Sequence, residues 1–244
     1  MSWGYCGGIG GWHEQLKVLK LEFPVTVAHG QPTYEVQFGA LARPADGEEE
    51  PALHWFDLTD KAGGRGVAVI NDSKYSYDVH ENRMHLTVLR SPVYAHHLPR
   101  ELDASEHYHF IDQGWQEFTY RMVPHQGSWQ SAGIPRLGYE LNVPMMAVVE
   151  ANRQGPLPTS GSLLEISAGN VLLSAAKRAE NGDGTIVRVY EAHGQPTDCD
   201  FCWRGKAQAC WKSTLRPYEV QTFHVPDQPG ARVRTVDLIE QEIG

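Results

Sequence analysis

Short runs in which apolar and polar residues alternate recur along most of the chain, and they leave little choice of secondary structure. Successive side chains of a β-strand point to opposite faces of the sheet, so this period-two alternation is typical of strands with one buried face. Leu19–Val25, Tyr34–Phe38, Met84–Val88 and Phe118–Met122 follow it closely. The 24 glycines and 15 prolines of the chain favour turns between such runs. The sequence therefore predicts an all-β protein.

Further β-rich runs extend the pattern to both halves of the chain. No window of about 12 or more residues has a helical apolar stripe with a cap at both ends. Asn181–Gly184, with the sequence Asn-Gly-Asp-Gly, predicts a hairpin turn, because tight turns need residues that adopt left-handed backbone conformations. The additional predicted strands are Gly66–Ile70, Met145–Val149, Val171–Ala175, Thr185–Tyr190 and Tyr218–Val225.

The length of 244 residues corresponds to about 1.6 domains at roughly 150 residues per domain. A boundary is predicted at Asn152–Ser162, which holds two prolines, two serines and two glycines between apolar strand patterns. We expect residues 1–20 to be a linker or the start of a fragment, because Met1–Trp12 is rich in glycine. Residues 21–155 are then a larger β-sandwich and residues 160–244 a smaller one.

Charge and composition exclude two classes of function. The chain has 30 acidic and 21 basic residues and a net charge of −9, which repels phosphate backbones and argues against nucleic acid as a partner. No run approaches the ~20 apolar residues that cross a bilayer, so we expect no membrane role. Met1–Trp12 lacks the features of a signal peptide, and four cysteines are too few for a disulfide scaffold. We therefore expect a cytoplasmic protein.

Two patterns suggest a metal but do not require one. Cys199 and Cys202 form a Cys-x-x-Cys motif, yet a zinc site needs a second pair of ligands and a redox motif needs a helical context. We interpret these cysteines as packing residues. His107 and His109 share one face of a strand, but no acidic residue pairs obviously with them. Solvated or hydrogen-bonding histidines are the better interpretation, so no metal site is predicted.

A polar loop, Asn71–Asp78, follows the apolar run Val67–Ile70. Its amide, carboxylate and ammonium groups suit the hydroxyls of a sugar, and its tyrosine rings suit the apolar face of a pyranose. The alternative is a turn in which Asn and Asp side chains bond to nearby backbone, and spacing alone favours this alternative slightly. The chain contains no nucleophile motif, zinc-protease motif or phosphate-binding glycine loop.

Several segments, taken in order, resemble the C-terminal region of glycoside hydrolase family 38, the α-mannosidases. The resemblance covers residues from about 21 to 225. It departs from the family at Ser76, where glycine is common, at Gln116, where histidine is common, and at His96–His109, which looks like an extra surface loop. The segments that carry it are Phe23–Val25, Thr33–Gly39, His54–Thr59, Gly66–Tyr75, Leu89–Pro92, Phe118–Tyr120, Pro124–Gly127, Leu141–Pro144, Arg188–Glu191 and Pro217–Thr222.

The resemblance implies a large antiparallel sandwich, a galactose-mutarotase-like supersandwich, followed by a smaller C-terminal sandwich. It also implies that the chain is a detached, non-catalytic part of a retaining, zinc-dependent α-mannosidase. Family members carry the zinc ion and the catalytic aspartate in an upstream barrel, which a helical bundle follows. No catalytic residue and no cofactor is then expected in this chain, and its partners are the remainder of the enzyme and mannosides.

Within this resemblance, Asn71, Asp72, Lys74 and Tyr75, with Arg90 next, are the candidate substrate-binding residues. They would hydrogen-bond to hydroxyls and stack on the sugar, or they would anchor the interface with the barrel. A free-standing carbohydrate-binding module is the alternative function. A third hypothesis, a mutarotase-like enzyme, would pair His125 or His109 with Glu117 or Glu140, but no spacing singles out such a pair. The module would need an aromatic platform, for which the candidates are Trp115, Trp129, Trp203 and Trp211.

Overall fold

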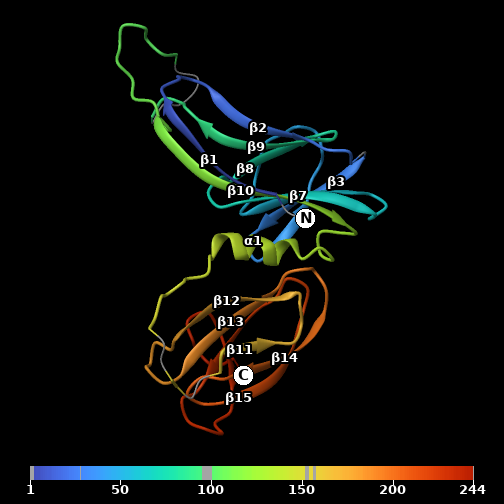
Figure 1. Ribbon diagram of the computed structural model, residues 1–244, viewed down its shortest axis with the longest axis vertical. Helices are drawn as coiled ribbons and strands as arrows, with labels where there is room; N and C mark the ends of the chain where they lie inside the picture. The colour runs from blue at the N-terminus through green and yellow to red at the C-terminus, as the bar shows by residue number, and fades with distance from the viewer. Residues whose placement is uncertain (1–2, 28, 95–100, 152–153, 156–157, 244) are drawn as a thin grey trace. The chain divides into compact units, whose positions relative to one another are not determined.

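The computed structural model describes residues 3–27, 29–94, 101–151, 154–155 and 158–243, with side chains from residue 10 onward. Its strands pair in antiparallel fashion, which confirms the all-β prediction (Figure 1). The chain divides into two units. The first comprises Met1–Val36 and Leu41–Pro144, and the second comprises Gln37–Ala40 and Met145–Gly244.

As far as Pro144, the chain forms two antiparallel sheets. One has the strand order β1-β10-β7-β6-β3-β4 and the other the order β2-β9-β8-β5. The elements are β1 (Trp3–Trp12), β2 (Val18–Pro24), β3 (Gly30–Val36), β4 (Gly39–Ala42), β5 (Glu50–Pro51), β6 (Trp55–Asp60), β7 (Arg65–Asn71), β8 (Ser76–His80), β9 (Arg83–Arg90), β10 (Gly114–Gln126) and the helix α1 (Ile134–Asn142).

The core of the first unit joins residues from both sheets. Phe56, Leu58 and Val69 come from the six-stranded sheet, and Met84 and Leu86 come from the four-stranded sheet. All five are buried. They occupy alternate positions of their strands, as the period-two pattern predicts. The first unit is therefore the large antiparallel sandwich.

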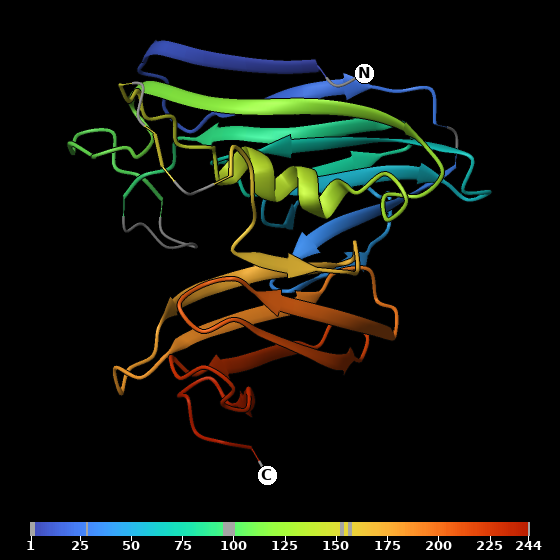
Figure 2. The same cartoon turned by 60° about the horizontal axis from the view of Figure 1, so that its bottom comes forward.

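Helix α1 covers the outer face of the six-stranded sheet (Figure 2, yellow-green). Gly138 lies so close to Trp55 that a Cβ atom there would be 3.0 Å from the indole ring. The rings of Trp55 and Trp129 have centroids 5.2 Å apart, and Nδ2 of Asn142 donates to the Asn71 carbonyl at 3.1 Å. The helix has nine residues, so it is too short to show a helical apolar stripe over about 12 residues.

Two sequence expectations are wrong in this region. The N-terminal segment is not a linker over its whole length, because β1 pairs with β10 from Trp3 opposite Met122 to Ile9 opposite Gln116. Backbone hydrogen bonds form this ladder, so its glycines do not prevent it. The predicted strand Met145–Val149 is irregular chain, since no neighbouring strand bonds to it among the described residues.

The division between the units falls at Pro144, before the predicted boundary at Asn152–Ser162. Residues 152–153 and 156–157 of that segment lie outside the described residues, as do residues 96–100 of the expected extra loop. The domain limits 21–155 and 160–244 stay a prediction.

The second unit is the smaller sandwich. Its sheets have the orders β11-β14-β15 and β12-β13-β16-β17, and Phe201, Leu215 and Phe223 are buried in its core. The predicted hairpin turn joins β12 to β13, and a Cβ atom on Gly184 (φ 92°) would lie 2.3 Å from the Val225 carbonyl oxygen. The strands are β11 (Leu164–Ile166), β12 (Val171–Arg178), β13 (Thr185–Glu191), β14 (Thr197–Trp203), β15 (Ala209–Leu215), β16 (Val220–Val225) and β17 (Arg234–Val236).

The cysteines only partly follow the packing prediction. Cys199 is free and buried in the core of the second unit. Cys202, however, forms a disulfide with Cys210. The two residues are directly opposite each other on β14 and β15, with Cα atoms 4.2 Å apart. Opposite residues of antiparallel strands lie close enough for their sulfur atoms to bond.

Candidate functional site

Asn71, the last residue of β7, builds the turn that begins the predicted polar loop. Its buried side-chain oxygen accepts hydrogen bonds from the backbone N–H groups of Ser73 at 3.1 Å and Lys74 at 2.6 Å. Its Nδ2 donates to the hydroxyl of Tyr77 at 2.7 Å, and that hydroxyl donates to the Lys74 carbonyl at 2.5 Å. Burial raises the pKa of Tyr77, which keeps the hydroxyl protonated. The buried Asn71 side chain thus fixes the conformation of the loop through its hydrogen bonds to Ser73, Lys74 and Tyr77.

Asp72 fixes the loop to the neighbouring strand β10. Its backbone N–H donates to the Thr119 carbonyl at 3.2 Å, and its Oδ1 accepts from the Thr119 N–H at 3.0 Å. The same oxygen accepts from the Ser73 hydroxyl at 2.8 Å. These bonds extend the sheet past the end of β7. The turn that sequence spacing slightly favoured is therefore present.

Lys74 places a half-buried ammonium group beside β10. Its Nζ donates to Oε1 of Gln116 at 3.3 Å and lies 5.5 Å from the centroid of the Phe118 ring. Burial lowers the pKa of Lys74, and this effect is larger than the opposite effect of the Asp112 and Asp72 charges, which raise it. Gln116 makes this polar contact although the resemblance places a histidine at its position. The ammonium group can donate further hydrogen bonds, because it has three protons.

Tyr75 and Arg90 complete the predicted set and are both exposed. The Tyr75 side chain is 53% exposed, while its carbonyl accepts from the backbone N–H of Ala52 at 3.2 Å. The Arg90 N–H donates to Oδ2 of Asp112 at 3.2 Å. The structure therefore brings Asn71, Asp72 and Lys74 together in one bonded loop, with the Tyr75 ring outside it. Asp112, which accepts from the Arg90 N–H, also acts on Lys74 through its charge.

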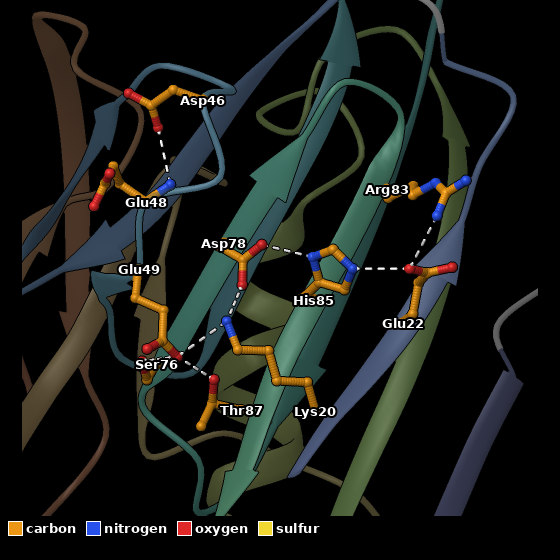
Figure 3. A network of polar contacts seen from close by, with 10 residues as sticks. All are labelled: Lys20, Glu22, Asp46, Glu48, Glu49, Ser76, Asp78, Arg83, His85 and Thr87. Carbon is orange, nitrogen blue, oxygen red and sulfur yellow. Dashed lines mark hydrogen bonds and ion pairs between the residues drawn. The ribbon is translucent and has the colours of Figure 1, made fainter. Parts of the chain in front are cut away.

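A polar network that sequence reasoning missed covers the outer face of the four-stranded sheet (Figure 3). Its centre is the carboxylate of Asp78, whose side chain is 5% exposed. One oxygen accepts from Nζ of Lys20 at 2.6 Å, and the other lies 2.5 Å from Nδ1 of His85. Nε2 of His85 lies 3.0 Å from Glu22, and Lys20 lies 3.4 Å from Glu49.

The network joins β2, β8, β9 and the segment before β5, and its charges pair with one another. Such pairing suits a structural role for this face more than a binding role. The alternation of apolar and polar residues placed Lys20 on the polar face of its strand, whereas Asp78, which lies in β8, was assigned to the polar loop. It did not show which strands are neighbours, so the pairing was not predictable from one sequence.

A second cluster that sequence reasoning missed joins β6 to the end of β10. The fully buried Asp57 accepts from the Thr59 hydroxyl at 2.5 Å, and Nε2 of His125 lies 2.7 Å from its other oxygen. Nδ1 of His125 lies 3.2 Å from the Gly127 carbonyl oxygen. His125 thus contacts Asp57, and its side chain is only 5% exposed. A carboxylate and a carbonyl both accept hydrogen bonds, so this geometry suits an imidazole protonated on both nitrogens.

Neither a cluster of metal ligands nor a helix of membrane-spanning length is found among the described residues. Over that part of the chain, no three His, Cys, Asp or Glu side chains gather in a way that would hold a metal ion. The rings of His107 and His109 pack edge to face, with centroids 5.3 Å apart. Among the same residues, no helix has the length and apolar character needed to cross a bilayer.

Comparison with known families and proteins identifies the class. The profile of the glycosyl hydrolases family 38 C-terminal domain matches residues 9–99, and that of the family 38 C-terminal beta sandwich domain matches residues 170–207. With the two antiparallel sandwiches, these matches define a C-terminal β region of a glycosyl hydrolase. The chain belongs to glycosyl hydrolase family 38, as the C-terminal region of an α-mannosidase.

Individual relatives agree with this assignment. Alpha-mannosidase 2C1 of Homo sapiens is 38% identical over 200 residues, which cover 77% of this chain and 18% of the relative. The alpha-mannosidase of Saccharomyces cerevisiae is 30% identical over 209 residues, which cover 75% of this chain and 17% of the relative. The chain thus spans less than a fifth of the length of these relatives.

A solved structure supports the fold. The crystal structure of an alpha-mannosidase from Enterococcus faecalis V583 has a TM-score of 0.73 and 18% sequence identity. The match covers 91% of this chain and 27% of that one. At this level of identity, the likeness extends to the fold.

Proposed function

We propose that this chain is the non-catalytic C-terminal part of a retaining, zinc-dependent α-mannosidase that hydrolyses terminal α-mannosyl residues. The observation that carries the proposal is the 38% identity to a protein named alpha-mannosidase, over 77% of this chain but only 18% of that relative. In this proposal the partners are the remaining barrel and helical bundle, the substrates are mannosides, and the compartment is the cytoplasm.

Zinc belongs to the part of the enzyme outside this chain in this proposal. The described residues do not fit a zinc site, because no three suitable side chains gather among them. No chemical step is therefore assigned to a metal here. The contribution of this chain is to bind and orient substrate at the edge of the sugar pocket.

The loop Asn71–Tyr75 is the part that we propose for this role. Asn71 and Asp72 use their side chains to fix the loop, which supports a positioning function for them. Lys74 would donate hydrogen bonds to sugar hydroxyls, and the exposed Tyr75 ring would cover the apolar face of the sugar. Arg90, whose backbone is tied to Asp112, would make a further contact.

The test is Lys74→Met in the full-length enzyme, with steady-state kinetics on a mannoside. A lost hydrogen bond from a charged group costs about 1.5–3 kcal/mol, so KM should rise roughly tenfold or more. Lys61→Met, which changes an exposed lysine of the same unit, is the control and should leave KM unchanged.

Unchanged kinetics together with a lowered melting temperature would contradict the sugar-binding role of Lys74. That result would support the alternative in which the loop anchors the interface with the barrel. The family assignment does not depend on the outcome.

A further inference from the structure

Of the four tryptophans that the sequence offers as an aromatic platform, one has the exposure that a platform needs. The Trp115 side chain is 69% exposed, whereas Trp129 is 7% exposed. Trp203 and Trp211 pack against the core of the second unit. Trp115 lies near the start of β10, next to the edge strand β1.

The indole ring of Trp115 rests on the backbone of β1. A Cβ atom on Gly10 would lie 2.5 Å from Cζ3 and 2.9 Å from Cε3 of the ring, so a side chain there would displace the ring from the backbone. The pairing of β1 with β10 shifts register between Ile9 and Trp12, and Gly11 in that shift has a φ of 66°. The local backbone thus supports one side of the ring, and the high exposure leaves the other to solvent.

A hydrogen-bond acceptor lies on the same face of the sheet as the ring. Glu117 is exposed and lies two residues further along β10, hence on the same face of the sheet as Trp115. Its cross-strand neighbour on β1 is Gly8. Phe118, the next residue of β10, points to the opposite face and into the core.

An exposed ring with an exposed carboxylate on the same face of the sheet suits the chemistry of a pyranose. The apolar C–H face of a sugar packs on an aromatic ring, and its hydroxyls donate to carboxylate oxygens. The net charge of −9 and the Glu117 carboxylate disfavour an anionic ligand. We propose that Trp115, Gly10 and Glu117 form a binding site for a neutral hexopyranoside. The proposal does not rest on the function of the Asn71–Tyr75 loop.

The test is titration of the 244-residue chain with mannobiose and with cellobiose, followed by saturation-transfer NMR. We expect saturable binding of at least one disaccharide by the wild-type chain. Trp115→Ala should weaken that binding roughly tenfold or more, because it removes the aromatic face on which the sugar packs. Trp115→Phe should retain part of the affinity, because it keeps a ring.

Two further variants separate this geometry from a general effect of exposed aromatic residues. Gly10→Ala should also weaken binding, because the added methyl group displaces the indole ring. Tyr94→Ala, which removes another exposed aromatic residue of the first unit, is the matched control and should bind as the wild type does. Circular dichroism verifies that each variant is folded. No saturable binding by the wild type, or equal loss in Tyr94→Ala and Trp115→Ala, overturns the proposal.

Discussion

A single glycine makes room for the buried His125–Asp57 pair. Gly66 lies opposite both Thr59 and His125 in the sheet. A Cβ atom there would be 2.5 Å from Cε1 of His125 and 2.7 Å from Oγ1 of Thr59. Gly66, Asp57 and His125 belong to separate segments of the sequence. Their association depends on the strand order β10-β7-β6, which alternation does not encode.

Gly66→Ala should therefore destabilise the first unit. The methyl group must displace the imidazole from Asp57, and overpacking of this kind costs about 1–3 kcal/mol. Urea unfolding measures the change in the free energy of unfolding. Gly64→Ala is the matched control, because its Cβ atom would lie 3.5 Å from the nearest atom, an ordinary contact. Equal stability of the two variants would show that the sheet can accommodate a methyl group at Gly66 without displacing His125.

The same pair should make stability depend on pH. Burial is the largest single influence on the pKa of His125 and lowers it, but the hydrogen bond and charge of Asp57 together with bonds to backbone outweigh burial and leave the pKa raised from 6.5. The stabilisation is thus complete below about pH 6.5 and is lost as the pH rises through the higher folded-state value. Urea unfolding between about pH 6 and 9, with His125→Gln as the comparison, measures it. The difference between the two proteins should shrink as the pH rises, and a constant difference would contradict the prediction.

At the scale of elements, the sequence located about half of the strands that the described residues form, but not their partners. Alternation predicted β2, β3, β9 and β10, and β-rich runs predicted β7, β12, β13 and β16. It missed β1, whose glycines carry no periodicity, and α1, whose nine residues are too few. In the candidate site it found the loop Asn71–Tyr75. Lys74 contacts Gln116, which lies 42 residues further along the sequence. The periodicity of single strands could not predict this contact.

The hairpin β14–β15 provides a test at this scale. Its Cys202–Cys210 disulfide closes a short loop, with a sequence separation of 8. Cys202→Ser should lower the melting temperature of the oxidised chain, since a loop of this size contributes about 2–3 kcal/mol. Cys210→Ser should have the same effect. With a reductant present, as in the proposed cytoplasmic compartment, wild type and variants should converge. A difference that persists after full reduction would contradict this account.

At the scale of the whole molecule, the sequence predicted two sandwiches, and each unit has its own buried core. Each unit's core mixes residues from both of its sheets, so the alternation that favours strands also favours sandwich formation. The limit between the units was less predictable. Glycine, proline and serine mark irregular chain in general, and the irregular segment here begins earlier, directly after α1.

The isolated chain should not hydrolyse 4-nitrophenyl α-mannoside. This expectation follows from the proposal that catalysis resides in the remainder of the enzyme, since this chain covers 18% of a relative. Release of 4-nitrophenol should equal that of a protein-free blank, with the full-length enzyme as the positive control. Saturable turnover by the isolated chain would refute its proposed non-catalytic role.

The irregular segment after α1 has a consequence for handling the protein. Met145 is 99% exposed and Val149 is 100% exposed, and no strand pairs with the backbone between them. Proteases bind their substrates as extended chain and cut where backbone is accessible. The bond after Met145 or Met146 is therefore a natural cleavage point, and brief digestion with a protease that prefers large apolar residues would nick the chain here before it attacks either sandwich.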